Sequence, residues 1–381
     1  MAFNFDESID RRHSDSYKWQ KYRDRDVIPL WVADTDFRSP PCIIEALHAR
    51  VEHGVFGYGA PPAELAALFV ERMLTRYQWR VKPEWLVFLP GLVSGLNLAV
   101  RALTQADSSV VIPAPIYPPF RAAARGAERG QRLAPMVLAE ERWRVDLAAI
   151  EPEMDGWEQL LMLCNPHNPG GTVYRREELA QHLAFAQRHD LLVCSDEIHC
   201  DLLLEPGVAH IPFGSLGEDA EQRSITLMSP SKSFNIAGLG ASLAIIPNAR
   251  LRMKFIAQRS GIVPNVDVLA YVAATAAWRD GQPWLEEQLD YLRGNRDWLA
   301  ARINTLPGLS MAAPEATYLA WIDAGRLGVD NLQRFFEQAG VGLSPGADFG
   351  DPRFVRLNFG CPRALLVQAV ERMARAVQAL G

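Results

Sequence analysis

Lys232 is the only charged residue in residues 229–239, SPSKSFNIAGL, which lie between the apolar runs SITLM and GASLAIIP. Small or hydroxylated residues, including Ser231 and Ser233, surround it. A lysine amine that loses its proton is a nucleophile and forms Schiff bases with carbonyl compounds. A single lysine on a loop is more often solvated than catalytic, so a chemical role for Lys232 depends on what other residues accompany it.

Three further residues that could do chemistry also follow short apolar runs. Asn168 comes after QLLMLCNP and precedes a proline and two glycines, which form a tight turn. Asp196 ends a buried run, DLLVCSDE, where an acid is costly unless a cation or a hydrogen-bond donor pairs with it. Tyr117 stands between prolines after SVVIPA, and its ring could stack on a flat ligand. Each also has an ordinary explanation, as a turn, a structural ion pair or a core tyrosine.

An anion site is suggested by Gly91, which follows WLVFLP and precedes the helical pattern LVSGLNLAVRAL. Backbone N–H groups at a helix start are free to bind an anion, and the helix dipole favours the negative charge. Because a glycine before a helix is common, this signal is weak by itself.

The apolar runs that precede these residues resemble strands covered on both faces, because nearly all their residues are apolar. Amphipathic helical patterns lie between several of them, so we predict an α/β domain with a mostly parallel central sheet. Ligands of such sheets bind beyond the carboxyl ends of the strands. The candidate residues should therefore gather at one edge of the sheet. The six runs are residues 85–90, 109–114, 159–166, 190–197, 224–230 and 241–247.

The pattern changes after about residue 280. One long helical pattern covers residues 283–306, and shorter elements and a last helix follow it. We predict a large domain of residues 46–282 and a smaller α+β domain formed by residues 1–45 and 283–381. The N-terminal segment is expected to pack on the smaller domain or across a subunit interface.

Together the candidate positions offer an amine, an acid, an amide, an aromatic ring and a seat for an anion. A phosphorylated, protonated aromatic aldehyde would use all five. Pyridoxal 5'-phosphate (PLP) is such a molecule: lysine forms a Schiff base with it, an acid pairs with its pyridinium nitrogen, and an aromatic ring stacks on its face.

The motifs around these residues resemble those of the PLP-dependent aspartate aminotransferase superfamily of fold type I. Further motifs are similar to its bacterial cystathionine β-lyase / cysteine-S-conjugate β-lyase branch, the C–S lyases. The resemblance runs from Phe5 to the last helix and implies a PLP-dependent transferase-like fold. The first set of motifs is SPSKSFNIAGL, NPHNPGG and SDEIHCDL; the second is FDESIDRRHSDSYKW, IPLWVADTDFRSPP, APIYPPF and VRLNFGCPR.

The resemblance implies a role for each matching residue around the cofactor ring. Lys232 should be the Schiff-base lysine, and Asp196 should keep the pyridine nitrogen protonated. Asn168 should bond the ring hydroxyl oxygen, and Tyr117 should stack on the ring.

It also implies residues for the phosphate. The backbone N–H groups of Leu92 and Val93 should hold it, together with Ser229 and Ser231. Tyr58, in FGYG, resembles a tyrosine that reaches the phosphate from the partner subunit, so we expect a homodimer with shared catalytic sites.

The substrate residues follow in the same way. Arg356, in FVRLNFG, resembles the arginine that pairs with the substrate α-carboxylate, for which a planar guanidinium is suited. The backbone of Ala33 should contact that carboxylate, and Asn168 should also border the substrate. One position departs from the wider superfamily: Gly240 stands eight residues after the lysine, where many aminotransferases have a phosphate-binding arginine. The β-lyase branch commonly lacks this arginine too, which favours a lyase.

Three functions stay open at this point. The resemblance favours a PLP-dependent carbon–sulfur β-lyase that cleaves cystathionine or another S-substituted cysteine to a thiol, pyruvate and ammonia. The alternatives are a class I/II aminotransferase, which shares most of the motifs, and a PLP-binding regulatory protein. An apparently complete catalytic set disfavours the last.

Composition limits the partners. The chain has 381 residues and a net charge of -6, and it has no basic block, so nucleic acid is not an expected partner. No apolar run approaches the length of a membrane span, and the N-terminus has no secretory signal. Five scattered cysteines without a pairing pattern fit a reducing cytoplasm. His199 and Cys200 are adjacent potential metal ligands without a second cluster, so no metal site is expected.

Overall fold

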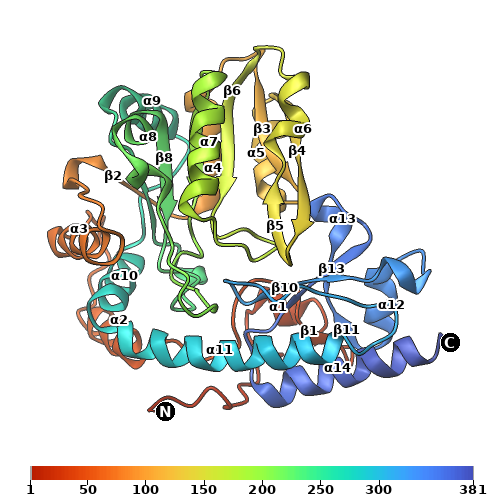
Figure 1. Ribbon diagram of the computed structural model, residues 1–381. Coiled ribbons are helices and arrows are strands. Elements are labelled where there is room, and N and C mark those ends of the chain that lie inside the picture. The colour runs from red at the N-terminus through yellow and green to blue at the C-terminus, as the bar shows by residue number, and fades with distance from the viewer. Residues whose placement is uncertain (1, 381) are drawn as a thin grey trace.

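An eight-stranded sheet forms the centre of the larger part of the molecule in the computed structural model, which describes residues 2–380 (Figure 1). Its middle strands are parallel, and only β9 and β5 run against their neighbours. The predicted α/β fold with a mostly parallel sheet is confirmed. Across the sheet the order is β2 (Leu86–Leu89), β9 (Ser242–Ile245), β8 (Ser224–Met228), β7 (Leu192–Asp196), β6 (Glu158–Cys164), β3 (Ser109–Ala114), β4 (Gly130–Ala139) and β5 (Arg142–Val145).

All six predicted strands are present, but the hairpin of β4 and β5 was not predicted. Helix α5 (Pro118–Gly126) ends shortly before this hairpin, and β4 begins at Gly130. Residues 133–139 of β4, LAPMVLA, are apolar, but Pro135 within the run counts against a strand, and most β4 residues are exposed or only half-buried.

Helices cover both faces of the sheet, which explains why its strands are apolar throughout. On one face α4 (Leu92–Leu103), α5 and α9 (Ala249–Arg259) share a core with Val110 and Ile112 of β3. On the other face α7 (Arg176–Arg188) and α8 (Glu218–Arg223) share a core with Val111 of the same strand. Successive residues of one strand thus bury their side chains in opposite cores.

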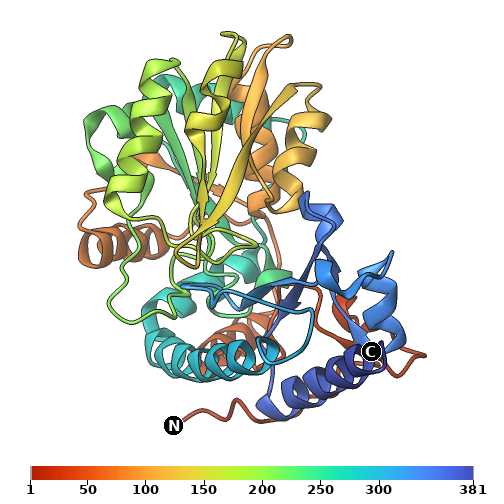
Figure 2. The ribbon, with the colours of Figure 1, turned by 45° about the vertical axis from the view of Figure 1, so that its right-hand side comes forward.

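The smaller part of the molecule contains an antiparallel sheet of β10 (Leu319–Asp323), β13 (Phe354–Asn358) and β12 (Ser344–Pro345). The long helix α11 (Gln282–Ile303) and the last helix α14 (Arg363–Gln378) pack against it in one core with α12 (Leu332–Gln338). Figures 1 and 2 both show α11 and α14 at the bottom of the molecule, away from the eight-stranded sheet.

The N-terminal segment joins this smaller part through β1 (Ile28–Pro29), which pairs with β11 (Val341–Gly342). Beyond it, α10 (Val268–Asp280) packs on α2 (Pro41–Glu52) and on α3 (Ala63–Tyr77). The domain limits predicted at residues 45/46 and 282/283 stay a prediction.

The remaining short helices are α1 (Tyr17–Gln20), α6 (Leu147–Ile150) and α13 (Gly346–Phe349).

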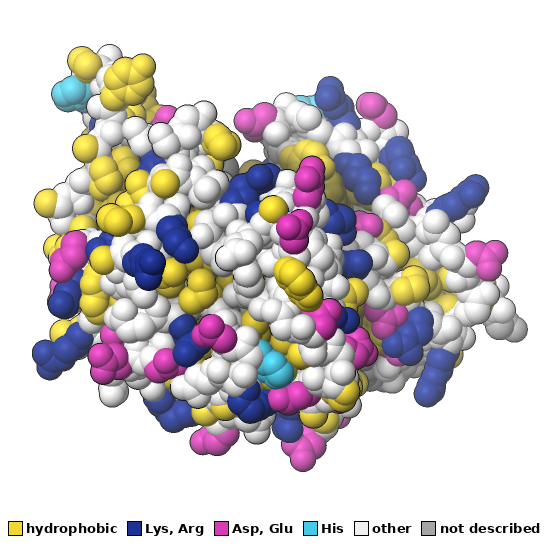
Figure 3. Space-filling model, turned by 90° about the horizontal axis from the view of Figure 1, so that it is seen from above, with side chains coloured by type: hydrophobic (Ala, Val, Ile, Leu, Met, Phe, Trp, Pro, Cys, Tyr) yellow, Lys and Arg dark blue, Asp and Glu magenta, His cyan; other side chains and the backbone are white. Residues whose placement is uncertain are grey.

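The surface carries charges of both signs. In the face shown in Figure 3, Lys and Arg side chains lie interspersed with those of Asp and Glu. Within residues 2–380 no helix is both long and apolar enough to cross a membrane.

Buried ion pairs and hydrogen bonds hold the N-terminal segment together around Asp36. The Lys18 side chain has no exposed surface, and its Nζ lies 2.7 Å from Asp36 Oδ2. Asp36 also accepts from Arg11 Nη1 at 2.6 Å and from Trp19 Nε1 at 2.8 Å. Three donors therefore converge on one buried carboxylate, and the removal of that carboxylate would leave the Lys18 charge without its nearest partner.

We predict that Asp36→Ala lowers the free energy of unfolding by about 3–5 kcal/mol, because it leaves a buried cation uncompensated. Asp10 is the matched control, since its pair with Arg12 lies in the same segment but is exposed. Asp10→Ala should have little effect on stability, because exposed ion pairs contribute little. Urea unfolding followed by circular dichroism measures both, and equal losses in the two variants would contradict the prediction.

Candidate active site

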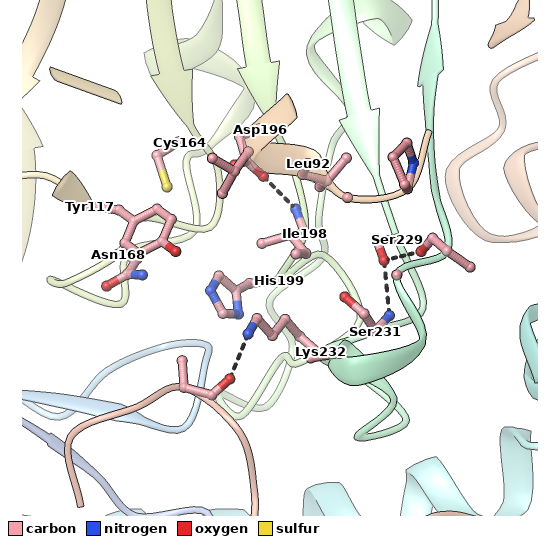
Figure 4. A pocket seen from close by; sticks show the side chains of 17 residues that line it. Leu92, Tyr117, Cys164, Asn168, Asp196, Ile198, His199, Ser229, Ser231 and Lys232 are labelled. Atoms are coloured by element: carbon pink, nitrogen blue, oxygen red, sulfur yellow. Dashed lines mark hydrogen bonds between the residues drawn. The ribbon is translucent and has the colours of Figure 1, made fainter. Parts of the chain in front are cut away.

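Nine of the predicted site residues line one cavity at the carboxyl ends of the strands, with a volume of about 210 Å³ (Figure 4). Strand β7 ends at Asp196, and Asn168 and Lys232 follow β6 and β8 respectively. Tyr117 follows β3. The nine are Ala33, Leu92, Val93, Tyr117, Asn168, Asp196, Ser229, Ser231 and Lys232.

Lys232 is half-buried, and its Nζ donates a hydrogen bond to the carbonyl oxygen of Ala33 at 2.6 Å. Burial lowers the pKa of Lys232 to about 8, and the nearby Arg356 charge lowers it further against the opposing effects of Asp34 and Asp196. About a tenth of this amine is therefore uncharged at pH 7, far more than for an ordinary lysine, and the uncharged form is what a nucleophile or a base requires.

Asp196 is buried at the end of β7, and its Oδ1 accepts from the backbone N–H of Ile198 at 3.1 Å. Burial raises the pKa of Asp196 to about 7, because one backbone hydrogen bond and the more distant Lys232 do not compensate the lost hydration. The carboxylate thus lacks a close cationic partner among the described residues. A protonated ring nitrogen placed beside it would supply one.

The opposite end of the cavity suits an anion. Helix α4 starts at Leu92, and Gly91 at its N-cap position provides no side-chain cap, so the first N–H groups of the helix are available to a ligand. Ser229 and Ser231 lie beside them, where the Ser231 N–H donates to Ser229 Oγ at 3.0 Å. The amine, the acid and this anion seat fit the aldehyde, the ring nitrogen and the phosphate of PLP.

Gly240 explains why an arginine is absent from the phosphate end. Its φ is +65°, a left-handed conformation that disfavours side chains, and a Cβ here would lie 2.5 Å from the carbonyl oxygen of Pro90. Any larger residue would require the backbone at Pro90 to move. The backbone at this position therefore excludes arginine.

Arg356 and Asn168 connect the cavity to the smaller part of the molecule. Arg356 is buried on β13, and its Nη1 donates to Asn168 Oδ1 at 2.9 Å while its Nη2 donates to the Trp31 carbonyl at 3.0 Å. Its guanidinium also lies 4.6 Å from the ring centre of Phe349. Burial lowers the pKa of Arg356 to about 10, which still leaves it charged at neutral pH.

Tyr117 lies at the cavity wall, as Figure 4 shows, and its backbone N–H donates to the Asn168 carbonyl at 3.0 Å. Burial raises the pKa of its phenol. Two predicted residues do not line the cavity: Arg356 contacts Asn168 at its wall, whereas Tyr58 lies away from it. Tyr58 is fully exposed and borders a different hollow with Phe56 and Val268.

His199 lines the cavity, although its sequence context suggested only a weak metal ligand. Figure 4 shows it between Asn168 and Lys232. Burial lowers the pKa of His199 to about 3, with Lys232 and Arg356 adding to the effect, so the ring is neutral. Its Nδ1 is buried without a hydrogen-bond partner among residues 2–380. Its place three residues after Asp196, on the turn that follows β7, was the available signal. Residues 2–380 contain no group of three or more His, Cys, Asp or Glu that could hold a metal ion.

The chain belongs to the family described as aminotransferase class I and II, which it matches over residues 25–373. The predicted superfamily is thereby confirmed, and with it the expected fold.

Relatives narrow this assignment. The chain is 38% identical to cystathionine beta-lyase PatB of Bacillus subtilis (strain 168), over 98% of this chain and 100% of that protein. It is 65% identical to the chain in the crystal structure of OvoB, with a TM-score of 0.98 and coverage of 99% of this chain and 100% of that one. The PLP-bound C-S lyase from Staphylococcus hominis is 31% identical, with a TM-score of 0.91 and coverage of 98% of both chains.

The two shifted groups predict how the stability of the cofactor-free protein depends on pH. The Asp196 pKa is raised from 3.8 to about 7, so its contribution is fully present below pH 3.8 and is lost as the pH rises through 7. The Lys232 pKa is lowered from 10.5 to about 8, so its contribution is present above pH 10.5 and is lost as the pH falls through 8. Between pH 7 and 8 both groups destabilise the fold.

We therefore predict that Asp196→Asn stabilises the cofactor-free protein by about 2–4 kcal/mol at pH 8 and has almost no effect at pH 4. Urea unfolding at both pH values measures this. The exposed Asp107 serves as control, and Asp107→Asn should leave the pH dependence as it is. An equal effect of Asp196→Asn at the two pH values would contradict the assignment of the raised pKa.

Proposed function

We propose that the protein is a PLP-dependent carbon–sulfur β-lyase. It would cleave cystathionine or a related S-substituted L-cysteine, with water, to a thiol, pyruvate and ammonia. One observation carries the proposal: a half-buried amine, a buried acid and a free helix N-terminus share one cavity, beside a buried arginine. The full-length relatives named cystathionine beta-lyase and C-S lyase support sulfur as the atom at which the substrate is cleaved.

When bound, PLP supplies an aldehyde that amines attack and a protonated ring that accepts the electrons released at the substrate Cα. Asp196 would hold the proton on the ring nitrogen, because its carboxylate lacks a close cation without one. The N-terminus of α4 and the hydroxyl group of Ser231 would hold the phosphate. Ser229 Oγ donates to the Ala241 carbonyl at 2.6 Å and accepts from the Ser231 N–H at 3.0 Å, so Ser229 would border the phosphate and position Ser231.

Lys232 would move the proton at the substrate Cα. Its lowered pKa makes the uncharged amine available near neutral pH. The Ala33 carbonyl accepts one of its N–H groups, which fixes the nitrogen and leaves its lone pair free. The same nitrogen, once protonated, could pass the proton to the departing sulfur, so that the thiol leaves neutral.

Arg356 would bind the substrate carboxylate with the planar guanidinium that such a group requires. A guanidinium can only donate, so Asn168 presents its oxygen to Arg356 and turns its amide N–H groups elsewhere. Those N–H groups are then available to the ring hydroxyl oxygen. Asn168 would thus contact the cofactor through its amide N–H groups. Through its amide oxygen it contacts Arg356, the residue that would bind the substrate carboxylate.

An aminotransferase remains the second candidate, because the family includes that activity and shares the same cavity. It would return the Cα proton to the cofactor and keep the nitrogen, whereas a lyase releases ammonia without a keto acid. Gly240 favours the lyase, since the backbone there excludes the phosphate-binding arginine of many aminotransferases.

We also propose a homodimer whose partner subunit supplies Tyr58. Two observations support it. Val55, Phe56 and Tyr58 are all exposed, which is unusual for neighbouring large hydrophobic residues, and Val93 at the phosphate end of the cavity is 45% exposed.

All five cysteines are free thiols, which supports a reducing compartment such as the cytoplasm.

We predict that the purified protein, loaded with PLP, forms pyruvate and a free thiol from L-cystathionine without an added keto acid. Lys232→Ala should lower this rate at least about 100-fold, because it removes the proton-transferring amine. Lys254→Ala is the control, since that lysine is exposed and should leave the rate unchanged. Turnover that requires a keto acid would instead identify an aminotransferase.

The dimer proposal predicts that Tyr58→Ala and Lys232→Ala are each strongly impaired but regain activity when mixed under subunit exchange. Each mixed dimer would contain one site with both groups intact, so up to about a quarter of the wild-type activity should return. An active monomer in light scattering, or no recovery in mixed dimers whose formation is verified, would overturn this proposal.

A further inference from the structure

A short part of the N-terminal chain, residues 30–37, lies between the loop of Lys232 and strand β13; we name it the bridging segment. The carbonyl of Ala33 accepts from Lys232 Nζ at 2.6 Å, and the carbonyl of Trp31 accepts from Arg356 Nη2 at 3.0 Å. Tyr318 also donates to the Ala33 carbonyl, at 3.0 Å. The amine and the guanidinium are therefore both held by carbonyls of one segment, two residues apart.

Asn235 fastens this segment to the lysine loop. Its Oδ1 accepts from the backbone N–H of Thr35 at 3.1 Å, and its Nδ2 donates to the carbonyls of Thr35 at 3.1 Å and Phe37 at 2.8 Å. One side chain thus binds three backbone groups of a segment that lies about 200 positions away in the sequence.

The backbone at Asn235 is adapted to this task. Its φ is +53°, in the left-handed region that asparagine tolerates better than most residues other than glycine. Asn235 follows Lys232 by three residues, and its own carbonyl accepts from Ser39 Oγ at 2.9 Å. The loop that carries the amine is therefore joined to the N-terminal chain at both its side chain and its backbone.

A second asparagine holds the same segment from the other side. Asn358 on β13 donates through Nδ2 to the carbonyls of Val32 at 2.5 Å and Asp34 at 2.7 Å. It lies two residues from Arg356 on the same strand. Asn235 thus belongs to the lysine loop and Asn358 to the arginine strand, and both determine where the bridging segment lies.

We propose that Asn235 is a positioning residue for the reaction: it holds the bridging segment against the lysine loop and thereby sets the spacing between Lys232 and Arg356. This inference rests on the proposed function, because the spacing matters only if Lys232 acts on a substrate whose carboxylate Arg356 holds. The hydrogen bonds of Asn235 go to Thr35, Phe37 and Ser39 and to no residue that would hold the phosphate or the ring, so cofactor binding should change little without its side chain.

Asn235→Gly tests the role. Glycine adopts the positive φ without strain, so the variant removes the three hydrogen bonds and keeps the backbone conformation. We expect KM for L-cystathionine to rise roughly tenfold or more, kcat to fall less, and the dissociation constant for PLP to stay within about twofold. Amide hydrogen exchange measured by mass spectrometry should increase in residues 30–37, with or without cofactor.

Asn248→Ala is the control for a general loss of stability. Asn248 caps α9, away from the cavity, by accepting from the N–H groups of Arg250 and Leu251, so its removal should lower stability without changing KM. If the wild-type protein is active but Asn235→Gly keeps its KM, or loses PLP instead, the inference is wrong. If the wild-type protein cleaves no S-substituted cysteine at all, the proposed function fails, and this role fails with it.

Discussion

The burial of two ionisable groups in one cavity is the constraint on which the rest of the structure depends. Lys232 is partly removed from water and Asp196 almost wholly, and each has its pKa shifted toward the neutral form. Neither forms a direct ion pair with the other in the described chain. Such a site destabilises the fold near neutral pH, and a ligand that offers an electrophile to the amine and a cation to the acid relieves both costs. The surrounding fold must be stable enough to carry this cavity, and the two cores that cover the sheet provide that stability.

Parallel strands end at one edge of the sheet, so side chains at or just after these ends lie close together. Asp196 can be buried at the end of β7 since the strands on either side are also buried, and Lys232 follows the neighbouring strand β8. The phosphate end requires close backbone approach, and Gly240 permits it at a φ that few other residues adopt. Local backbone conformation and sheet topology thus combine to give one site with an anion end and an acid end.

The sequence was sufficient to predict the six main strands and the helix after Gly91, because apolar runs mark buried strands. Of the nine cavity residues, Tyr117, Asn168, Asp196 and Lys232 follow or end such runs, whereas the other five were named through the family resemblance. The sequence did not predict the hairpin of β4 and β5, whose strands are only partly buried, or the place of His199. Nor did it indicate what Asn235 binds. Hydrogen bonds from Asn235 to Thr35 and Phe37 join residues about 200 positions apart, and no local pattern reports such a contact. The assignments from the sequence were therefore most successful where a side chain follows its own strand.

Arg356 shows how the distant parts of the chain depend on one another. It lies on the small antiparallel sheet, and without Asn168 and the Trp31 carbonyl its buried charge would have fewer acceptors. Asn168 in turn can offer its N–H groups to the cavity only because Arg356 occupies its oxygen, since a guanidinium has no acceptor to offer. The Trp31 carbonyl is available only because the N-terminal segment is fastened in place, through Asn235, Asn358 and the buried Lys18–Asp36 pair. The orientation of one amide beside the cofactor cavity thus depends on contacts from the first 37 residues and from β13, and this explains why a site built mainly on the large sheet needs both ends of the chain.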